Sequence, residues 1–243
     1  MTPLLRSSLL TTRHGFSTRL GGVSTGRYAS MNPSAKWGDD PALVDENRKR
    51  LAAAGGFDRS RLFTAKQVHG SAIVRIAADS TPAEIAAREA DVLITDVPEV
   101  AVGVFTADCV PILATDGVRV GAAHAGWRGT VKNVAGVLLD ALVALGARRD
   151  QLRVAIGPSL CVRCFEVGEE VAAQFPLEAV RRDLGAKPRV DLWLANKLRL
   201  TGVAEIDLLG RCTMCEPDTF FSFRRDGGQV GQQLSFIVVP GSS

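Results

Sequence analysis

The chain has 243 residues and a mass of 25.8 kDa, enough for one large domain or two small ones with a sizeable core. Hydrophobic residues make up 46% of it and charged residues 23%, as in an ordinary soluble globular protein. The net charge of +3 and the scattered basic residues indicate no nucleic-acid partner.

Nothing in the sequence indicates a membrane partner or secretion. No stretch approaches the roughly 18 apolar residues of a membrane span, and Arg6 and nearby serines interrupt the N-terminal apolar stretch, which makes it a poor secretory signal. We therefore expect a cytoplasmic protein with a single domain over residues 1–243. The oligomeric state stays open.

The predicted elements mix helices with short strands that are rich in valine and isoleucine. In chain order we expect a helix at 41–56, strands at 71–77, 91–95, 101–107, 110–116 and 118–125, a helix at 130–146, a strand at 152–157, helices at 167–175 and 191–203, and strands at 206–210 and 234–240.

Capping and turn residues support this division. Pro41 begins the first helix, and Thr130 and Gly146 are the expected caps of the second. The sequence TDG at 115–117 predicts a tight hairpin turn. Hairpins mixed with helices favour an α+β fold, a single layered domain of mixed β-sheets flanked by helices. Dinucleotide-binding and Walker A motifs do not occur.

Three motifs place reactive side chains at element ends beside small residues. They are QVHG with His69, TADCVPIL with Cys109, and AAHAGWRGT with His124, one of only three histidines. Two imidazoles and a thiolate form a three-ligand set for a catalytic zinc with an open fourth position. The alternative is a buried structural cysteine and hydrogen-bonded histidines, because gaps of 40 and 15 residues match no local metal motif.

These motifs, together with HGFSTRLGGVS, IGPSLCVRCFEVGEEV and CTMCEPDTFFSFRRDG, resemble the YfiH/YlmD family from about residue 13 to about residue 238. The family was once called multicopper polyphenol oxidases, or laccase-domain proteins, and is now described as zinc-dependent purine nucleoside-metabolising enzymes. The resemblance implies that His69, Cys109 and His124 bind the metal. It also implies a single layered α+β domain.

The resemblance predicts phosphorolysis of adenosine, inosine or guanosine to free base and ribose 1-phosphate, with deamination of adenosine as a second reaction. Purine nucleosides and phosphate are thus the expected partners. A multicopper oxidase needs on the order of ten histidines, whereas a single blue copper needs only this ligand set. Zinc is favoured over copper, because activating water or polarising a purine needs a Lewis acid and no redox change.

Further residues are assigned expected roles near the metal. Arg128 is the first candidate for holding phosphate, and Arg19 and Arg225 are weaker ones, each with a surface salt bridge as its alternative. Asp108 would orient a ligand or accept a proton, or else accept hydrogen bonds from strand-end amides. Gln67 would read the purine edge.

Other functions use the same residues. Cys109 could act as a nucleophile with His124 as its base in a metal-free thiol hydrolase. An editing factor for peptidoglycan precursors is a related alternative, because some relatives are described so. A non-catalytic interaction module would leave the clustering of Cys, His and Arg beside glycines unexplained.

The remaining four cysteines form two CxxC pairs, Cys161 with Cys164 and Cys212 with Cys215. Four thiolates could close a tetrahedral structural zinc site. The 47 residues between the pairs contain two predicted helices, however, so the pairs need not meet. We expect free thiols here.

Overall fold

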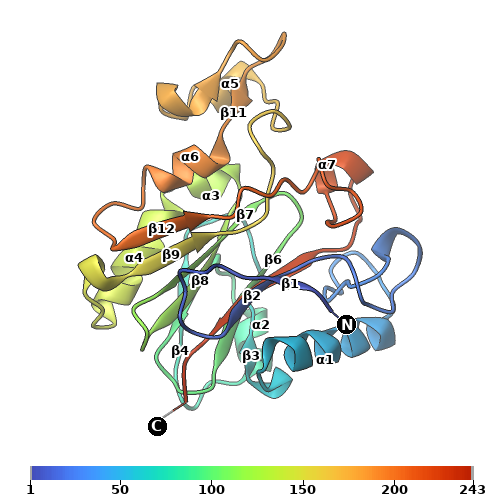
Figure 1. Cartoon of the computed structure of the whole chain (residues 1–243), viewed down its shortest axis with the longest axis vertical. Helices are drawn as coiled ribbons and strands as arrows, with labels where there is room; N and C mark the ends of the chain where they lie inside the picture. The colour runs from blue at the N-terminus through green and yellow to red at the C-terminus, as the bar shows by residue number, and fades with distance from the viewer. Residues whose placement is uncertain (1, 242–243) are drawn as a thin grey trace.

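Two mixed β-sheets face each other at the centre of the molecule, with helices on both outer faces (Figure 1). The computed structural model describes residues 2–241. The first sheet has the strand order β1 (Leu4–Leu5), β2 (His14–Ser17), β13 (Gln233–Val238), β6 (Ala101–Thr106) and β3 (Leu62–Phe63). The second has the order β12 (Glu205–Leu208), β9 (Arg153–Ile156), β7 (Val110–Thr115), β8 (Val120–Ala125), β5 (Val92–Thr95) and β4 (Ile73–Ile76). A separate antiparallel pair joins β10 (Val180–Arg181) to β11 (Arg189–Val190).

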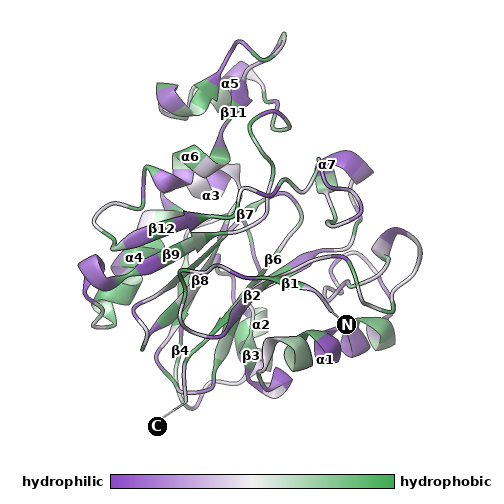
Figure 2. Cartoon of the chain, in the orientation of Figure 1, coloured by the Kyte–Doolittle hydropathy of each residue, from purple (hydrophilic) through white to green (hydrophobic). Residues whose placement is uncertain are grey.

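Side chains that alternate between the two faces of each strand contribute to separate hydrophobic clusters. In β7, Leu113 packs in the cluster between the two sheets with Phe16 and Ile237, whereas Ile112 belongs to the cluster on the outer face of the six-stranded sheet. In β13, Phe236 belongs to a third cluster, outside the five-stranded sheet. Successive side chains of a strand point to opposite faces, so one strand contributes to two cores. In Figure 2, hydrophobic segments occur along strands of both sheets, beside white and purple ones.

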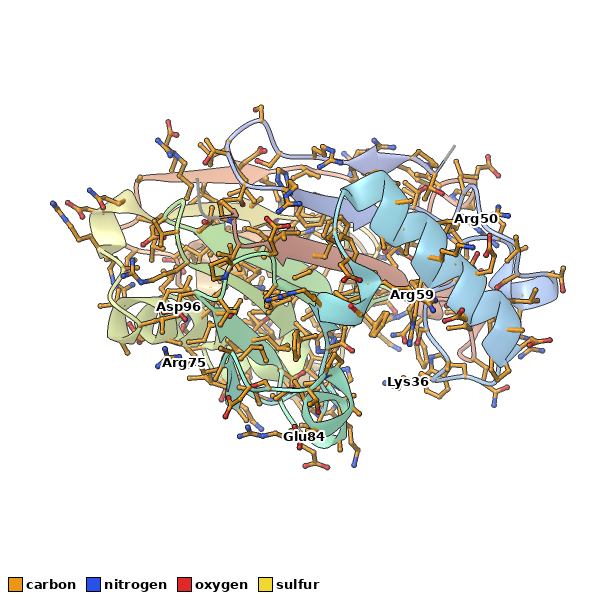
Figure 3. The ribbon with its side chains drawn as sticks, turned by 90° about the horizontal axis from the view of Figure 1, so that it is seen from below. Lys36, Arg50, Arg59, Arg75, Glu84 and Asp96 are labelled. Atoms are coloured by element: carbon orange, nitrogen blue, oxygen red, sulfur yellow. The ribbon has the colours of Figure 1, made fainter. Side chains whose placement is uncertain are left out.

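The two longest helices cover the outer faces. Helix α1 (Pro41–Gly55) begins after the N-cap Asp40 and ends at Gly56, whose φ of 68° is left-handed, and its Leu51 packs against the five-stranded sheet. Its solvent face is charged, and Arg50 and Arg59 lie along it in Figure 3, paired with Glu46 and Asp45. Helix α4 (Val134–Ala144) covers the six-stranded sheet.

The helix predicted over 130–146 is wrong at its start. Helix α3 (Trp127–Val131) and α4 are separate, and Asn133, at a φ of 61°, breaks them and caps α4 through Gly136 N. Thr130 lies inside α3 and is no cap. Asparagine tolerates this left-handed backbone better than most residues, which explains the break.

The other helices are short: α2 (Pro82–Ala87), α5 (Glu169–Ala172), α6 (Leu192–Lys197) and α7 (Phe223–Asp226), with 3-10 turns at Gly26–Tyr28, Arg59–Arg61, Arg149–Gln151 and Leu177–Ala179. The helices expected at 167–175 and 191–203 are present as the shorter α5 and α6. Within residues 2–241, none of the helices combines the length and apolar character needed to traverse a bilayer.

All eight predicted strands are present, with ends that differ from the predicted ones by at most two residues. The turn at 115–117 joins β7 to β8 in an antiparallel hairpin, with Gly117 at a φ of 95°. Parallel and antiparallel pairs occur in both large sheets, which confirms the α+β fold with mixed sheets. The short strands β1, β2, β3, β10 and β11 were not predicted.

Candidate active site

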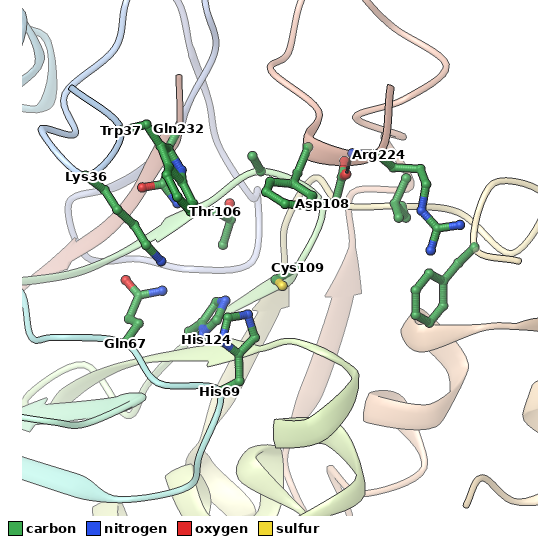
Figure 4. Close-up of a pocket in the computed structure, with 14 residues that line it drawn as sticks. Lys36, Trp37, Gln67, His69, Thr106, Asp108, Cys109, His124, Arg224 and Gln232 are labelled. Atoms are coloured by element: carbon green, nitrogen blue, oxygen red, sulfur yellow. Dashed lines mark hydrogen bonds between the residues drawn. The ribbon is translucent and has the colours of Figure 1, made fainter. Parts of the chain in front are cut away.

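The three predicted metal ligands meet where the chain passes from one sheet to the other. His69 lies in the connection from β3 to β4, and Cys109 in the connection from β6 to β7. Each connection leaves the five-stranded sheet and enters the six-stranded one, where His124 lies in β8. The ligand atoms of the three residues lie within 4.8 Å of one another. Figure 4 shows the Cys109 sulfur directed toward the two imidazoles.

Asp91 holds these ligands in place from behind. Its Oδ1 accepts hydrogen bonds from His124 Nδ1 at 2.7 Å and His69 N at 3.1 Å. Its Oδ2 accepts from Gly70 N at 2.6 Å and Val68 N at 3.2 Å. The residue is completely buried. With Nδ1 bound to this carboxylate, His124 has Nε2 left for a metal.

Asp91, which directly precedes the apolar strand β5, is not among the residues predicted from the sequence. A lone carboxylate at the start of a buried strand was the available signal.

Close backbone packing brings the ligands together. His69 and Asp108 have φ angles of 60° and 92°, in the left-handed region that non-glycine residues rarely adopt. A Cβ on Gly126 would lie 2.7 Å from His69 Cδ2 and 3.0 Å from Cys109 Sγ. Only glycine therefore leaves room at position 126 for this arrangement.

Cys109 and His124 shift each other's charge. Burial opposes ionisation of the thiol, but His124 and His69 outweigh it and lower the pKa of Cys109 to about 6. Burial also opposes a charge on His124, but Cys109 and Asp91 raise its pKa to about 9. Without a metal, the pair is thiolate and imidazolium at neutral pH.

A cavity of about 290 Å³ opens above the three ligands (Figure 4). Its walls combine aromatic rings, two cations and several polar side chains. Besides the ligands, the lining residues are Lys36, Trp37, Gln67, Thr106, Ala107, Asp108, Leu160, Phe165, Phe223, Arg224 and Gln232. Apolar walls with a few polar groups are typical of sites for small organic ligands.

One lining hydroxyl has no partner among the described residues. Thr106 Oγ1 is buried without a hydrogen bond, and the whole residue is only 1% exposed. Gln232 accepts a hydrogen bond from Ser34 through Oε1, and no bond of its Nε2 occurs within residues 2–241. Buried polar groups seldom stay unpaired, so this hydroxyl is an exception.

Gln67 and Asp108 line the cavity, but their polar atoms are engaged elsewhere. Both ends of the Gln67 amide bond to the backbone of Phe105, at 2.7 and 2.8 Å. Asp108 accepts from Thr213 Oγ1 and Arg224 N, each at 2.6 Å. Burial raises the pKa of Asp108, and these hydrogen bonds oppose the rise.

The three arginines expected to hold phosphate are not among the lining residues. Arg128 stacks on Trp127, and Arg19 lies over Phe221 and donates to Ala29 and Pro217 carbonyls. Arg225 donates to the Thr213 and Phe220 carbonyls and pairs with Asp226. The cations that line the cavity are Lys36 and Arg224, on opposite sides of the view in Figure 4.

The two CxxC pairs meet, contrary to our expectation. The sulfur atoms of Cys161, Cys164, Cys212 and Cys215 all lie within 4.8 Å of one another. The reason is the parallel pairing of β9 with β12, whose carboxyl ends lead into the two CxxC loops. A parallel pair needs a crossover connection, and the intervening helices provide it.

Comparisons with known proteins show which family the chain belongs to. The family model described as "Multi-copper polyphenol oxidoreductase laccase" matches residues 13–240. A "Purine nucleoside phosphorylase" from Deinococcus radiodurans is 42% identical over 246 residues, covering 98% of this chain and 93% of that protein. "Adenosine deaminase RL5", from an unknown prokaryotic organism, is 36% identical and covers 91% of this chain and 92% of its own length.

The fold has close structural neighbours as well. The crystal structure of YlmD from Geobacillus stearothermophilus matches with a TM-score of 0.88 and 31% identity, covering 99% of this chain and 100% of that one. Sequence and structure thus agree over nearly the whole length. The chain belongs to the YfiH/YlmD family, as its motifs implied.

Proposed function

We propose that this chain is a zinc-dependent purine nucleoside phosphorylase, with His69, Cys109 and His124 as the metal ligands. The observation that carries the proposal is a set of two imidazoles and one thiolate at a cavity that also has aromatic walls and two cations. The relatives named purine nucleoside phosphorylase support the substrate class.

The donor set fits zinc. Nitrogen and sulfur ligands from three side chains leave a fourth position toward the cavity, and Asp91 orients His124 as a carboxylate behind a metal-binding histidine does. Zinc bound there would supply a Lewis acid without redox chemistry. The three histidines of the chain are too few for the copper cluster that the older family description implies.

In phosphorolysis, a phosphate oxygen forms a bond to C1′ of the ribose while the bond from C1′ to N9 breaks. The electron pair of that bond stays on the purine, which takes up a proton as it leaves. Lys36 and Arg224, which lie on opposite sides of the cavity, would attract the phosphate and stabilise its negative charge. These two replace the arginines that the sequence suggested.

The aromatic residues would hold the base. Trp37 and Phe223 have ring centroids 6.2 Å apart and both line the cavity. Planar purines pack on such rings. Asp108 would position Cys109 and Arg224 through its hydrogen bonds to the loops.

Deamination of adenosine is the second candidate, and the relative named adenosine deaminase supports it. There the oxygen of water forms a bond to C6 and the amino group leaves as ammonia, with no need for phosphate. The same cavity would take the same nucleoside.

Incubation of the purified protein with adenosine, with and without phosphate, tests both reactions. We expect adenine and ribose 1-phosphate only when phosphate is present, and inosine in either case if deamination occurs. The His124→Ala variant should make neither product, and Lys36→Ala and Arg224→Ala should raise the KM for phosphate. Equal turnover by wild type and His124→Ala would contradict the proposal.

Chelation separates this mechanism from the thiol hydrolase. A Cys109 nucleophile paired with His124 would survive removal of the metal and remain sensitive to alkylation. We expect a chelator to abolish turnover and added zinc to restore it.

A further inference from the structure

The four remaining cysteines form a compact cluster outside the cavity. Two sulfurs come from the loop after β9 and two from the loop after β12. Cys164 Sγ and Cys215 Sγ are 3.3 Å apart, and all pairs lie within 4.8 Å. A tetrahedral zinc with bonds of about 2.3 Å to sulfur requires sulfur-to-sulfur distances of about 3.8 Å. The cluster therefore has the size of such a site.

The backbone around the sulfurs is shaped alike on both sides. Phe165 N donates to Cys161 O at 3.1 Å in the first CxxC loop, and Glu216 N makes the equivalent bond to Cys212 O at 3.2 Å in the second. Cys161 N donates to Cys212 Sγ at 3.3 Å, a contact that stabilises a thiolate. Backbone hydrogen bonds also join the two loops, because Ser159 N donates to Arg211 O and Thr213 N to Ser159 O.

We propose that Cys161, Cys164, Cys212 and Cys215 bind a second zinc ion in a closed, structural site. Four protein ligands leave no position for substrate, which is the arrangement of structural zinc sites. Binding displaces the thiol protons to solvent and changes no oxidation state. The site is independent of the proposed reaction.

The ion would brace one wall of the cavity. Leu160 and Phe165, which flank the first CxxC pair, line the cavity, and Leu160 N donates to Asp108 O at 3.0 Å. In the second loop, Thr213 lies between Cys212 and Cys215 and donates to the Asp108 carboxylate. Both zinc-bound loops thus contact the residue that precedes Cys109.

Metal stoichiometry tests the proposal. The full chain is purified with zinc and a reductant, freed of loosely bound metal, and analysed for zinc per chain. We expect about two ions in the wild type, one in His69→Ala/Cys109→Ala, and one in Cys161→Ser/Cys164→Ser. A single ion in the wild type that is lost in His69→Ala/Cys109→Ala would overturn the proposal.

Cobalt gives a second readout that does not depend on a cysteine variant folding. The His69→Ala/Cys109→Ala variant, loaded with Co²⁺, should show the intense visible absorption of a tetrahedral tetrathiolate site. Cys215→Ser, at an exposed position, should change that spectrum without unfolding the chain. Absence of the absorption counts against the site.

A disulfide between Cys164 and Cys215 is the competing outcome. Thiol titration of the unfolded, chelated and unreduced chain should find all five cysteines free if zinc occupies the cluster. Loss of two of the five thiols, with no second zinc, would replace the metal site by an oxidisable pair.

Discussion

Asp91 organises the candidate active site although it is no metal ligand itself. Its carboxylate binds the imidazole of His124 and the backbone of the QVHG loop at once. Burial opposes its negative charge, but the hydrogen bonds from His124 and the loop amides lower the pKa of Asp91. The carboxylate is therefore ionised at neutral pH.

The Asp91→Asn variant should bind zinc about 10- to 100-fold more weakly, which is the usual cost of losing a carboxylate behind a metal-binding histidine. The amide also presents a donor to backbone amides that need an acceptor. Competition with a chromogenic chelator measures the affinity. Asp116→Asn is the matched control, because Asp116 also accepts backbone hydrogen bonds, from Val118 and Arg119, but in the distant β7–β8 turn. Equal affinities in the two variants would contradict this role.

Zinc binding at His69, Cys109 and His124 should release about one proton between pH 6 and pH 9. In that interval the metal-free pair holds a thiolate on Cys109 and a proton on His124, since their pKa values are about 6 and about 9. The proton must leave before zinc binds, so affinity rises about tenfold per pH unit and levels off above about pH 9.

Calorimetry in two buffers of different ionisation enthalpy counts that proton. The Cys161→Ser/Cys164→Ser variant serves as the protein, so that thiols outside the active site add no protons. An affinity that stays constant across this interval would show that His124 is already neutral.

The three candidate metal ligands could be chosen from sequence because their motifs resemble those of the family, although their spacing matches no local metal motif. The residues around them could not. Thr106 and Arg224 come from segments far apart in the chain, and only the packing of the sheets brings them to one cavity. Arg128 follows the ligand motif closely, yet its position on α3 directs it to Trp127. Closeness in sequence to a ligand is thus a poor guide to the substrate side.

Among the elements, the junction of β8 and α3 controls how closely the ligands approach. Gly126 is the N-cap of α3 and lies against His69 and Cys109. In Gly126→Ala the new methyl would push both side chains away, and we expect loss of most of the active-site zinc.

Gly70→Ala is the control for that change, because it also lies beside His69. A Cβ on Gly70 would make contacts of 3.4 Å or more, so this variant should keep its zinc. Zinc per chain, measured in the Cys161→Ser/Cys164→Ser background, compares the two. Similar zinc content in both would rule out crowding as the reason for glycine at position 126.

Helices, strands and turns were predictable from sequence where residues within the element itself determine them. The hairpin at Gly117 and the caps of α1 follow from single residues. The pairing of β9 with β12 does not, because it joins segments some fifty residues apart and has no local signal. The meeting of the CxxC pairs was missed for the same reason.

At the scale of the whole molecule, a metal bound by the three candidate ligands would link the two sheets. His69 and Cys109 lie on two connections between the sheets, and His124 lies in the six-stranded one. A ligand that binds only the folded protein stabilises it, by about 2.7 kcal/mol at a concentration 100 times its Kd.

The Cys161→Ser/Cys164→Ser variant is first freed of metal with a chelator. Adding zinc at 100 times its Kd should then raise the free energy of unfolding by about 2.7 kcal/mol. Denaturant titration with and without zinc measures the difference. Adding His69→Ala should remove most of it, because the connection from β3 to β4 then contributes no ligand. A zinc effect unchanged by His69→Ala would place the stabilising ion elsewhere.

The position of β13 sets the order in which the protein can be completed during synthesis. This strand lies between β2 and β6 in the five-stranded sheet, yet it is made after every other strand of the described residues. Gln232, directly before this strand, lines the cavity. Until β13 emerges from the ribosome, the edges of β2 and β6 that pair with it have no partner strand, and they can pair with other strands. The cavity can therefore be completed only after β13 has joined the five-stranded sheet.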